Sequence, residues 1–321
     1  MTKKILISKE IDPAGMKLLE GKAEIITLKK FDIETIKDAV SDVVGIVLRT
    51  NIQINQEIID AAPLLKVISR TGGGVDNVDV IAASKRGIMV CNTLGINTNS
   101  VAEHSFALII SLAKQLKVLD NAVSRGEWKK RYTSKAIDLE NKILGLVGSG
   151  HIGRLLAKKC CIGFNMKVIA YDPYVKNLEN IELVPTIERL FSQSDFISIH
   201  VPLTEETHHL VDHKLFNIMK PTSYIINTSR GSVVNENDLI EALEKNIIAG
   251  AGIDVFEKEP PLSDNPLLKF ENVILTPHTA GLNRDCERKN AIQSVQAVID
   301  VLEGKTPLNI YNKKELIQRN H

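Results

Sequence analysis

Three polar clusters in the second half of the chain contain residue types suited to proton and hydride chemistry on a carbonyl group. They are Asn-Thr-Ser-Arg-Gly-Ser at 227–232, Asp-Val-Phe-Glu-Lys-Glu-Pro-Pro at 254–261 and Thr-Pro-His-Thr-Ala-Gly at 276–281. Arg230 supplies a permanent cation that would hold a carboxylate and a carbonyl oxygen, and His278 exchanges a proton near neutral pH. Glu259, bonded to the far imidazole nitrogen, would fix the tautomer of His278 and favour its protonated form. These types fit hydride transfer at C2 of a 2-oxo or 2-hydroxy acid.

Each of these residues, taken singly, also has an ordinary structural interpretation. Arg230 would be a surface charge, Glu259 would begin a loop ahead of two prolines, and His278 would be a turn residue. Their common placement favours one site, because each cluster follows a short apolar run of strand-forming residues. Ligands in doubly wound folds lie beyond the carboxyl ends of such strands.

The segment Gly148-Ser-Gly150-His-Ile-Gly153 has the spacing of a dinucleotide-binding fingerprint. It follows the apolar run Ile-Leu-Gly-Leu-Val and opens a helical pattern, which is the context that the fingerprint requires. Gly148 would permit the tight turn, Gly150 would let the backbone approach a pyrophosphate, and Gly153 would allow close packing of helix and strand. The helix N-terminus adds N–H groups and a positive dipole end. His151 and Ile152 belong to the same predicted cofactor loop, in which His151 is expected to face solvent.

An aspartate stands where this type of fold places the ribose of the cofactor. Tyr-Asp-Pro puts Asp172 at the end of the next predicted strand. A carboxylate there accepts hydrogen bonds from the ribose hydroxyls and repels a 2′-phosphate, so the sequence predicts NAD rather than NADP. The alternative is a structural turn with a surface aspartate.

Strand-like and helix-like segments alternate along the chain, which predicts parallel sheets with helices on both faces. The strands expected in the first hundred residues are 5–8, 24–28, 45–48, 66–69 and 89–92. The later ones are 143–147, 167–171, 196–200, 223–227, 249–254 and 273–276. The helices expected are 12–20, 32–40, 55–62, 78–86, 100–120, 237–245 and 285–302, with others in the remaining gaps. The fold class is therefore α/β, with two doubly wound parallel-sheet domains.

The segment 100–120 is predicted to be one long helix with a very apolar centre. Such a helix must be buried, either between domains or against another subunit, and a homodimer through this region is the expected assembly. The helix at 285–302 is expected to return the chain to the first domain. The predicted domains are a substrate-binding domain of 1–99 and 286–321 and an NAD-binding domain of 100–285.

Length and composition fit an ordinary two-domain globular protein, with 321 residues of which 44% are hydrophobic and 25% charged. The 40 basic and 39 acidic residues nearly cancel, which gives no general reason to expect a nucleic acid or a membrane as partner. The four cysteines show no paired spacing, and no metal site is expected. The sequence shows neither a signal peptide nor an apolar stretch of transmembrane length, so a cytoplasmic location is expected.

The chain resembles the D-isomer specific 2-hydroxyacid dehydrogenase family, and within it the phosphoglycerate dehydrogenase-like branch. The matching segments follow the family's order, and they are Ser69-Arg-Thr-Gly-Gly-Gly-Val-Asp-Asn, Ser100-Val-Ala-Glu-His, Gly148-Ser-Gly-His-Ile-Gly, Tyr171-Asp-Pro, His200-Val-Pro-Leu-Thr-Glu-Glu-Thr, Asn227-Thr-Ser-Arg-Gly, Asp254-Val-Phe-Glu-Lys-Glu-Pro and Thr276-Pro-His. The resemblance implies a Rossmann NAD-binding domain inserted into a flavodoxin-like substrate domain. It also implies the short form of the family, without a regulatory domain and its feedback control.

The resemblance further implies roles for individual residues. Arg230 would anchor the carboxylate and the carbonyl, and His278 would be the acid/base paired with Glu259. Asp254 would hold the nicotinamide carboxamide, and the backbone at 73–74 would bind the substrate carboxylate through Gly73 and Gly74. Thr228 is also implied to contact the cofactor. The residues implied to line the adenosine are His200, Pro202 and Thr207.

Two arginines in the first domain bear on the choice of substrate. Arg49 and Arg70 each follow a strand-like run, and two cations suit a phosphorylated or otherwise dianionic acid. In the resemblance, arginines at these positions point to 3-phosphoglycerate and 3-phosphohydroxypyruvate, and so to serine biosynthesis. The alternative for Arg70 is pairing with Asp76 or Asp79. The loop Asn92-Thr-Leu-Gly-Ile-Asn departs from the family's Asn-Ala/Thr-Pro, so we expect its shape to differ.

Other functions remain open at this point. The main alternative is a glycerate/hydroxypyruvate (glyoxylate) reductase or another small 2-hydroxyacid dehydrogenase. Phe31 is the only aromatic residue among the first hundred, which argues against bulky apolar substrates. The loop 69–77 lacks the lysine expected for phosphite dehydrogenase-like chemistry. An NAD-sensing, corepressor-like binding protein is the more distant alternative, and it would be expected to carry flanking tails that this sequence lacks.

Overall fold

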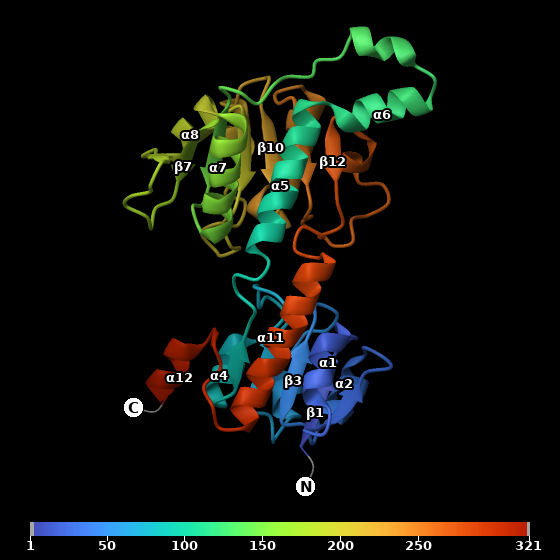
Figure 1. Cartoon of the computed structure of the whole chain (residues 1–321), viewed down its shortest axis with the longest axis vertical. Coiled ribbons are helices and arrows are strands. Elements are labelled where there is room, and N and C mark those ends of the chain that lie inside the picture. Colours follow the sequence, from blue (N-terminus) through green and yellow to red (C-terminus); the bar gives the residue numbers. More distant parts are fainter. Residues whose placement is uncertain (1–2, 320–321) are drawn as a thin grey trace. The chain divides into compact units, whose positions relative to one another are not determined.

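The structure is a computed structural model, and it describes residues 3–319. The chain forms two compact units, one made of the chain up to Asn97 and from Leu282 onward, the other of Thr98–Gly281 (Figure 1). Each unit is built on a wholly parallel sheet, which confirms the predicted α/β class. Among the described residues, none of the helices combines the length and the apolar character that crossing a bilayer requires.

The first unit contains a five-stranded sheet of order β2-β1-β3-β4-β5. Its strands are β1 (Lys4–Ile7), β2 (Glu24–Thr27), β3 (Gly45–Leu48), β4 (Val67–Arg70) and β5 (Met89–Cys91). Its helices are α1 (Pro13–Leu19), α2 (Ile33–Val40), α3 (Gln56–Asp60), α4 (Val80–Lys85), α11 (Arg284–Leu302) and α12 (Lys313–Arg319). One core lies between the sheet and α2, α3 and α4, and a second lies between the sheet, α1 and α11. The helix predicted at 285–302 therefore does return the chain to the first sheet.

The second unit contains a seven-stranded sheet of order β12-β11-β10-β9-β6-β7-β8. Its strands are β6 (Ile143–Val147), β7 (Lys167–Tyr171), β8 (Glu182–Leu183), β9 (Phe196–Ile199), β10 (Tyr224–Asn227), β11 (Gly250–Ile253) and β12 (Val273–Leu275). Its α-helices are α5 (Thr98–Ala113), α6 (Leu116–Ser124), α7 (His151–Phe164), α8 (Ile187–Gln193), α9 (His213–Asn217) and α10 (Glu236–Glu244). Short 3-10 helices are η1 (Trp128–Tyr132), η2 (Gly231–Val233) and η3 (Pro266–Lys269).

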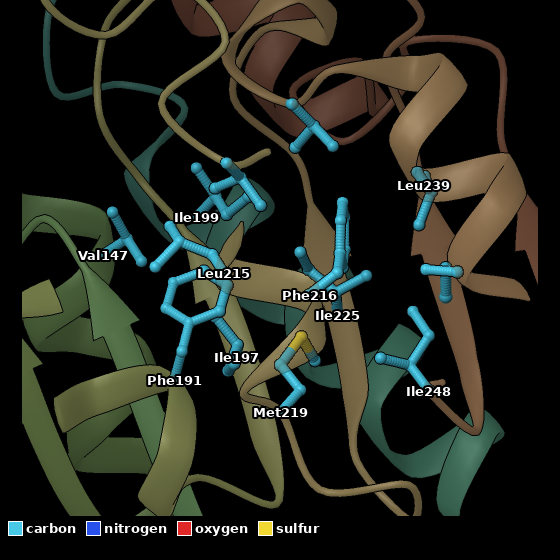
Figure 2. Close-up of a cluster of buried hydrophobic side chains, with 14 of the residues drawn as sticks. Val147, Phe191, Ile197, Ile199, Leu215, Phe216, Met219, Ile225, Leu239 and Ile248 are labelled. Carbon is cyan, nitrogen blue, oxygen red and sulfur yellow. The ribbon is translucent and has the colours of Figure 1, made fainter. Parts of the chain in front are cut away.

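Both faces of the second sheet are covered by helices. Figure 2 shows the core between the strands and α8, α9 and α10, where Phe191 and Phe216 pack against Ile197 and Ile225. On the opposite face α5 and α7 lie side by side over the strands (Figure 1). The central strands β9, β10 and β11 are buried along their whole length. Strands covered on both faces read as continuous apolar runs, which is why the sequence revealed them.

The single helix predicted over 100–120 is wrong, because the structure has two helices there. Helix α5 ends at Ala113, Gln115 takes a left-handed backbone with φ of 52°, and α6 begins at the next residue. The Gln115 side chain also leaves the helical path, since its Oε1 accepts hydrogen bonds from Ser134 Oγ at 3.1 Å and Lys135 N at 2.8 Å. The apolar side of α5 is buried inside its own unit, against α7 and the strands, and so does not require a second subunit to cover it.

Candidate active site

A histidine–carboxylate pair lies beyond the sheet of the second unit. His278 Nδ1 is 2.8 Å from Glu259 Oε2, and the Phe256 N–H donates to Glu259 Oε1 at 3.2 Å. Partial burial of the Glu259 carboxyl opposes its ionisation. The hydrogen bonds from His278 and Phe256 and the nearby charge of Arg230 outweigh that effect and hold its pKa below the usual value. Because an ionised carboxylate only accepts, Nδ1 of His278 carries the shared proton and Nε2 is left to face a substrate.

The loop that carries His278 is built around the buried carboxylate of Asp254. Asp254 is 0% exposed, and its Oδ1 accepts from Thr276 Oγ1 and from Thr279 N at 2.9 Å. Its Oδ2 accepts from Ala280 N at 2.9 Å. The His278 N–H donates to the Asp254 carbonyl at 2.7 Å, and His278 has a left-handed φ of 52°. Asp254, expected at the nicotinamide carboxamide, thus has both carboxylate oxygens engaged with the histidine loop in this structure.

Arg230 follows β10 and is held by a turn at Asn227. The Asn227 Nδ2 donates to the Arg230 carbonyl at 2.9 Å, and its Oδ1 accepts from Ser229 N at 3.0 Å and from Ser229 Oγ at 2.8 Å. Arg230 Nη1 in turn donates to the Ser229 carbonyl at 2.8 Å. Gly231 lies so close to the next loop that a Cβ would come within 1.9 Å of the Phe256 carbonyl oxygen. Only glycine permits this contact between the loops after β10 and β11.

The three residues predicted to react come from the carboxyl ends of adjacent strands. Arg230 follows β10, Glu259 lies in the loop after β11, and His278 follows β12, in a sheet with the order β12-β11-β10. Carboxyl ends of neighbouring parallel strands meet at one edge of the sheet. The hydrogen bond of Glu259 to His278 and the electrostatic influence of Arg230 on Glu259 place all three in one cluster.

The glycine turn lies between β6 and α7. Gly148 has a φ of 90°, which favours glycine, and a Cβ on Gly153 would lie 2.6 Å from the Gly148 carbonyl oxygen. A Cβ on Gly150 would meet nothing within 4 Å. Gly150 is the N-cap of α7 and provides no side-chain cap, while His151 is exposed and Ile152 is half-buried. The first turn of α7 therefore presents N–H groups beside an open backbone, which is the arrangement that a pyrophosphate needs.

Asp172 lies beside this turn, at the end of β7. Its Oδ2 accepts from both the Ser149 N–H and the Ser149 Oγ at 2.9 Å, and its Oδ1 accepts from Tyr174 N at 3.1 Å. Burial opposes ionisation of Asp172, but these bonds and the nearby charge of Arg154 hold its pKa below the usual value. The carboxylate is therefore ionised at neutral pH at the position where a ribose binds in this type of fold.

The residues predicted to line the adenosine share one segment after β9. Thr207 Oγ1 donates to the Pro202 carbonyl at 2.6 Å and accepts from Thr204 N at 2.7 Å, which closes a turn. His200 Nε2 is 2.9 Å from Ser198 Oγ, and burial lowers the pKa of His200 to about 4. His200 is thus neutral at pH 7, and its ring lies near the glycine turn, where a Cβ on Gly153 would come within 3.7 Å of His200 Cδ2.

Thr228 lies on the inner side of the loop after β10. It is 8% exposed, and its Oγ1 is 2.8 Å from Ser105 Oγ on α5. The Ser105 hydroxyl donates its proton to the Val101 carbonyl at 2.8 Å, so the Thr228 hydroxyl donates to Ser105. The side chain of Thr228 therefore joins the loop to α5 in this structure.

Arg49 lies just beyond the carboxyl end of β3 in the first unit. Its Nη1 donates to the Glu10 carbonyl at 3.1 Å, and its Nη2 is 3.2 Å from Glu287 Oε1 at the start of α11. The two side chains are 26% and 42% exposed. The guanidinium of Arg49 is therefore already paired with a carboxylate of its own unit.

Arg70 ends β4, the neighbouring strand. Its Nη1 donates to the Thr71 carbonyl at 2.8 Å, and the guanidinium lies over Gly72, where a Cβ would come within 1.6 Å of Nη1. Asp79, one of the alternative partners considered for Arg70, caps α4 by accepting from Ala82 N at 2.9 Å.

The glycine-rich loop after β4 is tied to the segment after β5. Thr93 N donates to the Gly72 carbonyl at 3.0 Å, and Asn92 Nδ2 donates to the Gly73 carbonyl at 2.7 Å. The amides of Gly73 and Gly74, which are the groups expected to bind a carboxylate, belong to this supported loop. Asn92 and Thr93 thus act as supports of this loop, a role that the sequence did not reveal.

The second unit holds groups suited to carbonyl reduction by a dinucleotide. The second unit holds an open helix N-terminus, an ionised Asp172 and a proton-exchanging pair beside a cation. No group of His, Cys, Asp and Glu able to hold a metal ion is present in the described part of the chain. The sequence did not reveal the supporting roles of Asn227 and Ser149, and their membership of the quoted motifs was the only signal for them.

Known proteins with similar sequences and structures support this description. Residues 106–280 match the sequence model described as D-isomer specific 2-hydroxyacid dehydrogenase, NAD binding domain. A glyoxylate reductase of Korarchaeum cryptofilum is 37% identical over 329 residues, which cover 98% of this chain and 97% of that protein. A D-3-phosphoglycerate dehydrogenase of Methanocaldococcus jannaschii is 38% identical, over 98% of this chain and 60% of that protein. The structure of an NADPH-dependent glyoxylate/hydroxypyruvate reductase from Sinorhizobium meliloti, in complex with NADP and malonate, has a TM-score of 0.88 at 27% identity and covers 98% of both chains.

Proposed function

The chain belongs to the D-isomer specific 2-hydroxyacid dehydrogenase family, and on this basis we propose that it reduces a small 2-oxo acid, glyoxylate or hydroxypyruvate, with NADH. It is an oxidoreductase that acts on a CH–OH group with NAD(P). One observation carries the proposal: the His278–Glu259 pair lies within the influence of Arg230 at the carboxyl edge of a sheet with a dinucleotide turn.

The residues of the cluster divide the chemical work. A nicotinamide cofactor, when bound, would supply the hydride for reduction at C2 of the substrate and would accept it in oxidation. Arg230 binds the carboxylate and polarises the carbonyl. His278 donates a proton from Nε2 to the carbonyl oxygen in reduction and removes it from the hydroxyl in oxidation. Glu259 accepts from Nδ1, which keeps Nε2 directed to the substrate and stabilises the protonated ring.

We assign NAD rather than NADP as the preferred cofactor. The turn from Gly148 to Gly153 would hold the pyrophosphate, and Asp172 would accept hydrogen bonds from the ribose hydroxyls. A 2′-phosphate at the same place would meet an ionised carboxylate. The Sinorhizobium meliloti reductase is NADPH-dependent, so the fold alone does not decide this preference and Asp172 supplies the physical reason for it.

Glyoxylate and hydroxypyruvate have better support than 3-phosphohydroxypyruvate, the substrate that the arginines of the first unit favoured at the level of sequence. The match extends over 97% of the Korarchaeum cryptofilum glyoxylate reductase but over 60% of the Methanocaldococcus jannaschii phosphoglycerate dehydrogenase. Arg49 also pairs with Glu287, so its charge is partly neutralised before any substrate arrives.

3-Phosphohydroxypyruvate is the second candidate because Arg49 and Arg70 follow adjacent strands. β3 pairs with β4, so both guanidinium groups belong to the same edge of the first sheet. A phosphate bound there would have to compete with Glu287 for Arg49. This competition predicts a weak response to the phosphate rather than a strong preference for it.

A substrate comparison tests the proposal. NADH oxidation would be followed by absorbance with glyoxylate, hydroxypyruvate, 3-phosphohydroxypyruvate, pyruvate and 2-oxoglutarate. We expect the highest kcat/KM with glyoxylate or hydroxypyruvate, and little change with these two in Arg49→Ala. A strong preference for 3-phosphohydroxypyruvate that is lost in Arg49→Ala would reject the proposed substrate and support the second candidate.

The same assay with NADPH tests the cofactor assignment. The unmodified protein should favour NADH, and Asp172→Ala should reduce that preference about tenfold, which corresponds to ~1.4 kcal/mol. Equal use of both cofactors by the unmodified protein would contradict the role given to Asp172.

We propose further that the two units divide the binding work. The unit of Thr98–Gly281 binds the cofactor, and the unit that contains Gly73 and Gly74 binds the substrate carboxylate through their amides.

We also propose that the protein forms a homodimer. The exposed apolar side chains on α6 and η1 support this assembly better than the buried face of α5 does.

A further inference from the structure

A chain of hydrogen bonds reaches from α5 to the loop that carries His278. His104 Nε2 is 3.0 Å from Thr276 Oγ1, and Thr276 Oγ1 donates to Asp254 Oδ1. We propose that His104 is a positioning residue, which acts through Thr276 and Asp254 to hold His278 in its reactive place. This inference rests on the acid/base role proposed above for His278.

The direction of each hydrogen bond follows from counting protons. The carboxylate of Asp254 accepts from three groups, namely the Thr276 hydroxyl and the N–H groups of Thr279 and Ala280. The Thr276 hydroxyl has a single proton, which goes to Asp254, so its oxygen can only accept from the imidazole. His104 must therefore carry a proton on Nε2. This assigns its tautomer without reference to any reaction.

The same carboxylate shapes the backbone on both sides of His278. Thr276 lies two residues before His278, and Thr279 and Ala280 directly follow it, so the loop encloses Asp254 from both directions. His278 itself has a φ of 52°, a left-handed conformation that non-glycine residues keep only where their surroundings hold it. Loss of one bond to Asp254 would relax this backbone and displace the imidazole.

The position of His104 makes its contribution difficult to replace with solvent. Its side chain is 24% exposed, Asp254 is 0% exposed, and the two lie 3.7 Å apart between Nε2 and Oδ1. Hydrogen bonds in the low-dielectric interior of a protein are stronger than in water. A buried polar group that loses its hydrogen-bond partner there also destabilises the protein more than an exposed one does. The next residue, Ser105, bonds to Thr228 in the loop after β10. Helix α5 thus supports the loops after β12 and β10 from consecutive positions.

Two substitutions at His104 separate positioning from simple packing. His104→Leu keeps the bulk but removes the donor, and we expect it to lower kcat about tenfold or more, since small misplacements of reacting groups have large effects on rate. The KM for NADH should stay within about twofold, because the glycine turn is untouched. His104→Gln retains an N–H donor and should recover most of the lost kcat. Equal rates in the wild type and His104→Leu would overturn the inference, as would a Gln variant no better than Leu.

A matched control is available on the surface of the same unit. His213 is 60% exposed and lies 3.6 Å from Asp238 Oδ2, at the start of α9. His213→Leu should leave kcat unchanged. If His104→Leu is too unstable to assay, Thr276→Ser and Thr276→Ala would replace it. The serine variant keeps the hydroxyl and should be active, the alanine variant should lose activity, and equal activity of the two would overturn the inference.

The tautomer of His104 provides a measurement that is independent of turnover. Heteronuclear NMR of the imidazole nitrogens should show a proton on Nε2 in the wild type, and its signal should change in Thr276→Ala. A proton on Nδ1 alone would overturn the assignment. If the wild type reduced no 2-oxo acid at all, the proposed function would fail. The NMR measurement of the His104 tautomer would still test the chain of hydrogen bonds in that case. An active wild type with an unaffected His104→Leu would instead reject the positioning role alone.

Discussion

At the scale of single residues, the acid/base assignment depends on how one carboxylate holds one imidazole. Glu259 is fixed by the Phe256 N–H and remains ionised because His278 and Arg230 outweigh the cost of its burial. The imidazole is 46% exposed, so a substrate can reach it. The proposed proton exchange and charge stabilisation therefore depend on side chains whose positions are set by the loops after β10, β11 and β12.

Replacement of His278 tests the acid/base role. His278→Ala should lower kcat by about 10²- to 10⁴-fold, the usual contribution of a general acid or base, with little effect on NADH affinity. Steady-state kinetics and fluorescence titration with NADH measure the two quantities. His209 is a matched control, because it pairs with Glu257 at 2.6 Å and has no proposed role in the reaction. If His209→Ala were as damaging as His278→Ala, the assignment would fail.

The pH dependence of reduction tests the role of Glu259. The pKa of Glu259 is lowered in the folded protein, so the pair is intact above the unfolded value and is lost only as the pH falls through the lowered one. The rate of reduction should therefore fall on the acid side only as the pH drops through the lowered pKa of Glu259. Glu259→Gln has no carboxyl group to protonate, so this acid-side fall should be absent from its profile, while Glu257→Gln should keep it. An identical profile in Glu259→Gln would count against the pair.

At the scale of elements, helix termini and strand ends place the groups that bind the cofactor. Helix α7 begins at the glycine turn, whose N-cap Gly150 provides no side-chain cap, and β7 ends at Tyr171, directly before Asp172. Ser149 in the turn donates to Asp172 through both its N–H and its hydroxyl, which joins the two elements. The proposed pyrophosphate and ribose positions are therefore set relative to each other before a cofactor binds.

Substitutions of Gly150, the N-cap of α7, and of Gly163, inside the helix, separate an effect on cofactor binding from an effect on helix stability. Gly150→Ala places a methyl group in the open space of the turn, so we expect the KM for NADH to rise about tenfold with little change in Tm. Gly163→Ala also meets nothing within 4 Å but lies inside the helix, so it should stabilise the protein by up to about 1 kcal/mol and leave KM unchanged. Kinetics and thermal unfolding of both variants provide the measurements. An unchanged KM in Gly150→Ala would argue against a pyrophosphate at this turn.

At the scale of the whole molecule, the proposed dimer relies on a segment that its own unit leaves uncovered. Helix α6 and η1 carry Leu116, Val123, Trp128 and Tyr132, which are 51%, 59%, 64% and 78% exposed. Arg131 lies over both aromatic rings, with its Cζ 5.9 Å and 5.3 Å from their centroids. Large exposed apolar side chains that lie close together on a surface commonly mark an interface.

Light scattering after size-exclusion chromatography tests this assembly. The wild type should elute with the mass of two chains, and a Trp128→Ser, Tyr132→Ser double variant should shift toward the monomer at micromolar concentration. Leu308→Ser alters a side chain that is 84% exposed in the first unit and should leave the mass unchanged. A monomeric wild type, or a double variant that remains fully dimeric, would contradict the proposed interface.

The sequence by itself determined the α/β class, nearly every strand and the glycine turn, and it predicted that Arg230, Glu259 and His278 lie in one cluster. These features depend on local patterns, such as buried apolar runs ended by glycine, asparagine or aspartate, which need no knowledge of distant contacts. The cap of α10 is one example, because Asn235 accepts from Asp238 N as expected for a helix start. The sequence could also predict that Arg230, Glu259 and His278 belong to one site, since the carboxyl ends of parallel strands lie at the same edge of the sheet.

Only the tertiary structure decided how these residues are supported and which of them are already engaged. Arg49 meets Glu287 across 238 residues, and His104 meets Thr276 across 172, and no local pattern encodes either contact. The break at Gln115 is likewise accompanied by a hydrogen bond from Ser134 that the apolar pattern of the helix does not reveal. Local periodicity specifies elements, whereas the partner of a charged or polar side chain depends on where the folded chain brings distant segments together.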